Sequence, residues 1–220
     1  MDASLDTDIV IHLYKSGKKE LLYSSFEKLY IYDFLFEKEM KRKSVLVYEE
    51  FKKDIEAGMV KVIANKDLIS MGIKGLFEDY KESNQYLFDQ GELQAVALAK
   101  AMGIAAFVSD DTKDFGPHQS LVKEIIEGVI PFAFYELLFI KFLNSEITIE
   151  ELHRSFEDVN KSSMTEFPMN FKRKLSEVLK RFSRKYGTNR DIKWISEYCN
   201  KRNINLNSKM LGLRDYLKKI

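Results

Sequence analysis

The stretch GELQAVALAKAMGIAAFVSDD, from Gly91 to Asp111, decides the fold. Its first part places small and apolar residues at helical spacing, which predicts a helix with Glu92 in its first turn. The apolar run Ala105–Val108 then predicts a short buried strand, and the aspartates Asp110 and Asp111 follow it. A helix that leads into a buried strand is typical of a parallel α/β sheet.

The same alternation of apolar runs and helical segments extends back to the amino terminus. The expected strands are Asp2–Leu5, Leu29–Tyr32, Val60–Ile63 and Ala105–Val108. Helices are expected to begin near Asp8, Asp33, Lys66 and Gly91. Because strands that are separated by helices pair in parallel through right-handed crossovers, we expect a three-layer α/β/α sandwich. Reactive groups in such sheets gather at the carboxyl ends of the strands.

The alternation stops near Gly128, and no strand is expected beyond it. We therefore predict an α/β domain over residues 1–128 and an all-helical, basic region over residues 129–220. The apolar run Val129–Leu143 contains Glu136 and Lys141 and is shorter than the roughly 20 residues that a membrane span needs. A buried helix is expected there instead.

Two short patterns predict helix ends in the second region. Thr148, with Glu151 three positions later, predicts a capping box at the start of the helix Ile149–Val159. The sequence KYGTN around Gly187 predicts a turn between two basic helical segments.

The net charge of +1 hides an uneven distribution. Residues 1–167 contain 20 basic and 30 acidic side chains, whereas residues 168–220 contain 15 basic and 4 acidic ones. A basic segment after an acidic one predicts that the basic part holds a phosphate backbone. The alternative is a basic surface that docks on the acidic domain. The residues expected to contact nucleic acid are Lys172, Arg173, Lys180, Arg181, Arg184 and Lys185.

Cysteine and histidine usage excludes several kinds of site. The single cysteine, Cys199, excludes a disulfide framework and a cysteine-based zinc site, and fits a reducing compartment. The amino-terminal sequence MDASLDTD lacks the features of a signal peptide, so a cytoplasmic protein is expected. His12, His118 and His153 are not at metal-ligand spacing, and we expect packing or surface roles for them.

Acidic residues follow the expected strands or begin the expected helices. Asp6 follows the first strand, Asp110 and Asp111 follow the fourth, and Asp114 lies one turn further on. Glu92 begins the helix before that strand. Any one of them is explained as a helix cap, but together they form an oxygen-only set that suits Mg²⁺ or Mn²⁺.

Three stretches resemble the signature segments of PIN-domain nucleases, including the VapC-like toxins: LDTDIVIHL at 5–13, FDQGELQAVALAKAMGI at 88–104 and AFVSDDTKDF at 106–115. The resemblance covers about residues 1–128. It implies a divalent-metal-dependent nuclease, in which a metal-activated water attacks the phosphodiester. The implied catalytic and metal-binding residues are Asp6, Glu92, Asp111 or Asp110, and Asp114, with Thr7 and Ser109 as supporting hydroxyls.

The resemblance also implies another acid near the start of the helix after the second strand. Glu37 and Glu39, in YDFLFEKEM, both compete for this position, and we favour Glu37 as the metal ligand. Asp2 is set aside because no strand precedes it.

The function expected from these features is a Mg²⁺- or Mn²⁺-dependent endonuclease that cuts RNA or DNA. Its implied partners are the nucleic acid, an antitoxin or inhibitor protein if the chain is a toxin, and a second copy of the chain. One alternative is a PIN scaffold that binds nucleic acid or protein without catalysis. Another is a haloacid dehalogenase-type phosphatase, suggested by Asp6 and Asp8, although the glycine-rich loop of that class is missing.

Overall fold

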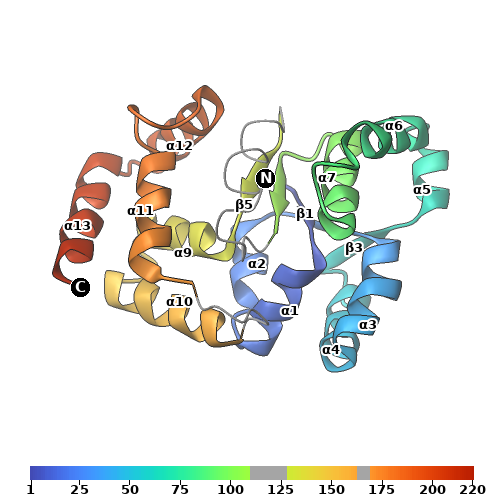
Figure 1. Cartoon of the computed structure of the whole chain (residues 1–220), viewed down its shortest axis with the longest axis horizontal. Coiled ribbons are helices and arrows are strands. Elements are labelled where there is room, and N and C mark those ends of the chain that lie inside the picture. The colour runs from blue at the N-terminus through green and yellow to red at the C-terminus, as the bar shows by residue number, and fades with distance from the viewer. Residues whose placement is uncertain (110–127, 163–168) are drawn as a thin grey trace. The chain divides into compact units, whose positions relative to one another are not determined.

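A computed structural model describes residues 1–109, 128–162 and 169–220 of the chain (Figure 1). The chain separates into two compact units, Met1–Ala133 and Phe134–Ile220. We call them unit 1 and unit 2.

Unit 1 contains a five-stranded parallel sheet, which confirms the expected α/β class. Its strands lie in the order β3-β2-β1-β4-β5. Their bounds are β1 (Ala3–Leu5), β2 (Leu29–Tyr32), β3 (Val60–Ile63), β4 (Ala106–Val108) and β5 (Ile130–Phe132). The first four agree with the predicted strands. Leu5 lies opposite Val108, so β1 and β4 end at the same level, where the site described below begins.

The fifth strand corrects the expectation that no strand follows Gly128. β5 pairs in parallel with β4, and Phe132 lies opposite Val108. It begins the apolar run Val129–Leu143, of which only the later part forms the expected buried helix. Periodicity does not distinguish a short buried strand from a buried helix, so the sequence predicted a single helix for the whole run. No helix in the described ranges is long and apolar enough to cross a membrane.

Near each of the four helix starts predicted in unit 1, at Asp8, Asp33, Lys66 and Gly91, a helix begins within two residues, and the unit contains further helices that the sequence did not predict. Their bounds are α1 (Thr7–Lys15), α2 (Glu20–Ser25), the π-helix η1 (Leu35–Met40), α3 (Lys41–Lys43), α4 (Val45–Glu56), α5 (Asn65–Ser70), α6 (Lys74–Asn84) and α7 (Gln90–Met102).

Helix α7 packs against β1, β2 and β4, and five consecutive residues, 95–99, are fully buried there. The Ser4 hydroxyl donates a 2.8 Å hydrogen bond to the carbonyl of Ala95, which joins β1 to this helix. Gly103 ends α7 in the left-handed region, with φ of 66°, which glycine adopts without a steric penalty.

Within its described residues, unit 2 consists of helices and their connections and contains no strand. It contains α9 (Phe134–Leu143), α10 (Ile149–Ser162), α11 (Phe171–Arg181), α12 (Asn189–Lys201) and α13 (Leu206–Lys219). The predicted capping box is present, because the Glu151 amide donates to Thr148 Oγ1 at 3.1 Å and the Thr148 amide donates to Glu151 Oε2 at 2.8 Å. The predicted turn around Gly187 separates α11 from α12.

Aromatic rings form much of the core of unit 2. The ring of Phe139, from α9, stacks on that of Phe182 with centroids 5.8 Å apart, and Phe134 lies 5.3 Å from Phe156 of α10. These rings bury a large apolar area, so they hold α9 against the surrounding helices.

Candidate active site

Asp6 lies between β1 and α1, at the carboxyl end of the central strand. It is the N-cap of α1, and its carboxylate is buried, with a residue exposure of 4%. Asp6 Oδ1 accepts a 2.7 Å hydrogen bond from the Thr7 amide, and Oδ2 accepts one of 3.2 Å from the Ser109 hydroxyl. The Asp6 amide itself donates to the Val108 carbonyl at 2.9 Å. The carboxylate is therefore held by the ends of two neighbouring strands.

Glu92 reaches the same region from the first turn of α7. The Glu92 amide donates to Asp89 Oδ1 at 3.0 Å, and the Asp89 amide donates to Glu92 Oε2 at 3.4 Å. This capping box fixes the start of the helix, and Glu92 is buried with an exposure of 6%. One box thus brings two further carboxylates, Asp89 and Glu92, toward Asp6.

Gly91 marks the point where a carboxylate from η1 approaches Asp6. A Cβ atom built on Gly91 would lie 2.9 Å from Asp6 Oδ1 and 3.2 Å from each carboxylate oxygen of Glu39. The two side chains therefore converge on the backbone of α7, and only glycine leaves room for both.

Glu37, the residue favoured from the sequence, points elsewhere. It is exposed, and its Oε2 accepts a 3.1 Å hydrogen bond from the Tyr48 hydroxyl on α4. The structure thus brings Glu39, and not Glu37, next to Asp6. The sequence YDFLFEKEM does not separate the two glutamates, because the burial of Leu35 and Met40 beside Glu39 is known only from the structure.

A lysine already neutralises part of this cluster. Lys43 Nζ lies 2.6 Å from Glu39 Oε1 and 2.7 Å from Asp8 Oδ1. Burial acts to lower the pKa of Lys43, but the hydrogen bonds to Asp8 and Glu39 outweigh it and raise the pKa above its usual value. Lys43 stays protonated, and a cation that bound Glu39 would compete with it.

Asp6 lies in a negative environment. Burial raises the pKa of Asp6 well above its usual value, and the charges of Asp8, Glu92, Asp89 and Glu39 raise it further. Within the described residues Asp6 forms no ion pair with Lys or Arg. A buried carboxylate that is surrounded by others favours a bound proton or a bound cation.

The remaining acids of the expected site, Asp110, Asp111 and Asp114, lie outside the described residues, as does His118. Ser109, which contacts Asp6, directly precedes Asp110 in the sequence. Among residues 1–109, 128–162 and 169–220, no three His, Cys, Asp or Glu side chains are arranged to hold a metal ion.

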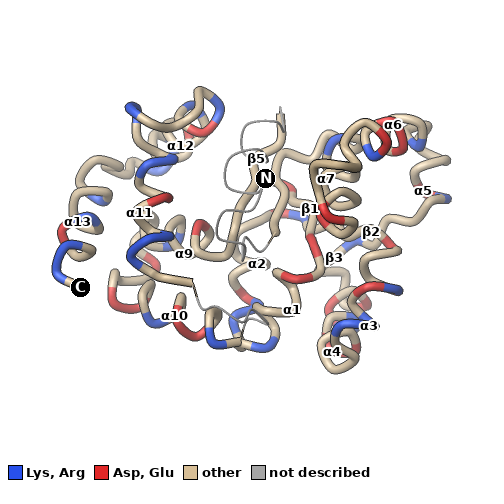
Figure 2. Tube along the Cα trace, in the orientation of Figure 1, with Lys and Arg blue, Asp and Glu red and all other residues tan. Residues whose placement is uncertain are grey.

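The basic residues that we expected to contact nucleic acid divide into two groups. Lys and Arg occur along α11, α12 and α13, shown in blue in Figure 2. Arg181 is buried, because its Nη1 lies 2.7 Å from Glu136 Oε1 and its Nε lies 2.7 Å from Asp191 Oδ2. It joins α9, α11 and α12 and is not part of a surface.

The other five basic residues are more exposed. Lys172, Lys180 and Arg184 line a cavity. Arg173 pairs with Glu177 at 3.3 Å, and the ammonium of Lys185 lies 5.0 Å from the centre of the Tyr186 ring.

The chain matches no protein-family model, no curated protein and no solved structure with which it was compared.

Proposed function

We propose that unit 1 is a divalent-metal-dependent nuclease of the PIN type, which hydrolyses phosphodiester bonds in RNA. The observation that carries this proposal is the buried carboxylate of Asp6 with four other carboxylates around it, at the end of a parallel sheet. In open α/β sheets ligands bind at this edge. Hard divalent cations prefer oxygen ligands, and a cluster of carboxylates supplies them.

The residues present fit such a cation in part. Asp6 and Glu39 converge at Gly91, and Glu92 adds its charge to the same region. These three are not by themselves arranged to hold a metal ion, and we propose that they do so together with acids that follow Ser109, with Glu39 in place of Glu37. Asp110, Asp111 and Asp114 complete the proposed set on the strength of their position in the sequence, directly after Ser109. A bound Mg²⁺ or Mn²⁺ would lower the pKa of a coordinated water and offset charge on the phosphate oxygens.

The chain's own residues prepare the carboxylates for this role. The Thr7 amide and the Ser109 hydroxyl each hold one oxygen of Asp6, which fixes the plane of its carboxylate. Such second contacts orient a ligand before a cation arrives. Lys43 holds Glu39 in the site and limits the repulsion between Glu39 and Asp8. The side chains of the site would then orient a cation, and no side-chain nucleophile is needed.

A second candidate is a scaffold that binds nucleic acid or protein without catalysis. The Lys43 ammonium favours it, because an internal cation already neutralises Glu39 and Asp8. In that case the acidic cluster would be structural, and divalent cations would neither stabilise the protein nor support cleavage.

A cleavage assay on the full chain separates the two candidates. A labelled RNA is incubated with the protein and Mn²⁺, with and without a chelator. The proposed nuclease cuts only without the chelator and leaves linear phosphate ends, because water attacks the phosphate. A 2′,3′-cyclic phosphate would indicate attack by the RNA's own 2′-hydroxyl, and would contradict the proposal. Asp111→Asn and Glu92→Gln should each abolish most of the activity.

A further inference from the structure

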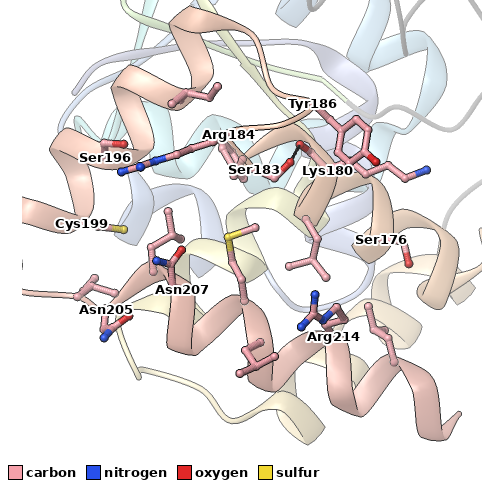
Figure 3. Close-up of a pocket in the computed structure, with 18 of the residues that line it drawn as sticks. Ser176, Lys180, Ser183, Arg184, Tyr186, Ser196, Cys199, Asn205, Asn207 and Arg214 are labelled. Carbon is pink, nitrogen blue, oxygen red and sulfur yellow. Dashed lines mark hydrogen bonds between the residues drawn. The ribbon is translucent and has the colours of Figure 1, made fainter.

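Unit 2 contains a cavity of about 1110 Å³ between α11, α12 and α13 (Figure 3). It is larger than the roughly 300–1,000 Å³ of a typical small-molecule site. Its lining is apolar over a large part, with Leu179, Met210 and Ile204 among the half-buried residues that form it. An apolar cavity of this size indicates a ligand with an apolar body.

All the charged residues that line this cavity are basic: Lys172, Lys180, Arg184, Arg214 and Lys218. Figure 3 shows Lys180 and Arg184 around the end of α11, and Arg214 on α13. Within the described parts of the chain, Lys180 and Arg184 form no ion pair with a carboxylate. The ligand of this cavity is therefore expected to be an anion.

The lining also offers hydrogen bonds. Ser196, Asn200 and Asn207 line the cavity, and their side chains form no hydrogen bond with another described residue. The apolar face of a partner helix would cover these groups and leave them unsatisfied, which is costly. A nucleobase has apolar faces and a polar edge, so it suits the same lining.

Tyr186 adds an exposed ring at the same cavity. Its exposure is 62%, and it lies on the turn between α11 and α12. Bases of single strands stack on such rings, whereas the bases of a duplex are already stacked and paired. An unpaired base is therefore favoured over a duplex.

We propose that this cavity binds an unpaired nucleotide of a single-stranded nucleic acid, with its base on the apolar wall and its phosphates at the basic rim. This inference rests on the proposed nuclease function, which makes nucleic acid the ligand of the chain. It restricts the substrate to single-stranded segments.

The test measures binding to the full chain in a chelator, so that no cleavage occurs. Three probes of one length are used: a single-stranded RNA, the same strand annealed to its complement, and a strand with abasic residues. The single strand should bind at least about fivefold more tightly than the abasic strand for each base that stacks. Equal affinity for these two strands would overturn the proposal.

Variants locate the binding in the cavity. Met210→Trp places a larger side chain at the apolar wall without a change in charge. Tyr186→Ala removes an exposed ring, and this second variant still tests the proposal if Met210→Trp misfolds. Both should weaken binding of the single strand and leave the abasic strand unchanged. Leu46→Trp, on α4 at an exposure of 85%, is the control. An unchanged affinity of Tyr186→Ala and a folded Met210→Trp for the single strand would contradict the proposal.

Charge variants test the rim separately. Lys180→Gln with Arg184→Gln should weaken binding of both the single strand and the abasic strand, and lower the salt slope by about 0.7 for each lost contact. Lys193→Gln with Lys201→Gln, both exposed on α12 and outside the cavity, is the matched control. If an acidic amphipathic peptide binds more tightly than RNA and displaces it, the cavity is a protein site and the proposal fails.

The outcomes for the two proposals are distinguishable. Base-dependent binding without metal-dependent cleavage would refute the nuclease and leave the cavity assignment standing. Metal-dependent cleavage that the cavity variants leave unchanged would support the nuclease and refute the cavity assignment.

Discussion

At the scale of single residues, Asp6 has an unusual environment for a carboxylate. It is buried at a strand end, and its two oxygens accept hydrogen bonds from Thr7 and Ser109. These bonds favour the ionised form, whereas burial and the surrounding carboxylates oppose it and raise its pKa. The position of Asp6 follows from its place after the first apolar run in the sequence. Its proximity to Glu39 does not, because residues 33 positions apart meet only through the fold.

The raised pKa of Asp6 predicts a pH dependence of stability. The folded, metal-free protein holds this proton more tightly than the unfolded chain does. The free energy of unfolding should therefore fall as the pH rises from about 4 through the folded pKa, by up to about 1.4 kcal/mol per pH unit from this group. Asp6→Asn should remove that part of the slope. Urea unfolding at several pH values in a chelator measures it, and parallel curves for the two proteins would contradict the assigned environment.

The burial of Arg181 is a second feature that could not be predicted from its neighbours in the sequence. Charge patterning places it with Lys180 in a basic run, but its side chain lies between Glu136 and Asp191, all three of them nearly inaccessible to solvent. Whether a charged side chain is buried depends on partners from other helices. The sequence of α11 alone does not contain that information.

A matched pair of variants tests this difference. Arg181→Met removes the guanidinium that Glu136 and Asp191 share, while Asp191 keeps its ion pair with Arg190. The loss of these buried ion pairs should destabilise the protein by about 3–5 kcal/mol. Lys180→Met, at the exposed neighbouring position, should change stability by no more than about 0.5 kcal/mol. Denaturant unfolding gives both values. Similar losses for the two variants would mean that the buried ion pairs are not what holds α9, α11 and α12 together.

At the scale of elements, four strands could be predicted because each is a short apolar run between polar segments. The fifth could not, because β5 continues directly into the apolar helix α9. The π-helix η1 lies where the sequence predicts an ordinary helix that begins near Asp33, because periodicity over so short a segment does not distinguish the two. π-helical turns are rare and often occur at functional sites, and this one carries Glu39 to Gly91.

Glu37 and Glu39 therefore form an internal comparison on one element. Glu39→Gln should weaken Mn²⁺ binding by at least about tenfold, because it removes a charge that faces the proposed cation. Glu37→Gln removes the same charge from an exposed side chain and should leave Mn²⁺ binding unchanged. The measurement is Mn²⁺-induced thermal stabilisation of each variant. If Mn²⁺-induced stabilisation were lost in Glu37→Gln alone, Glu37 and not Glu39 would be the metal ligand.

At the scale of the whole molecule, the charges of the chain are distributed between its two units. The acidic cluster around Asp6 belongs to unit 1, and the basic cavity belongs to unit 2. The charge counts divide the sequence between residues 167 and 168, which lies within unit 2, so they predict a basic carboxyl-terminal part but not the boundary between the units. The sequence did not predict that the basic residues would surround an apolar cavity, because Arg214 and Lys218 come from α13, far along the chain from Lys180. We propose that unit 1 carries out the chemistry and that unit 2 binds the substrate.

The central claim is that the cluster around Asp6 is a catalytic metal site. The most direct test is the initial rate of RNA cleavage in Mn²⁺ by the full-length wild type, Asp6→Asn and Asp2→Asn. Asp2 lies before the same strand but accepts a hydrogen bond from Tyr30, so it serves as the matched control. The account predicts that Asp2→Asn retains the wild-type rate and that Asp6→Asn loses at least about a hundredfold, more than residues that only orient a ligand. Metal-dependent cleavage by folded Asp6→Asn at the wild-type rate would contradict it.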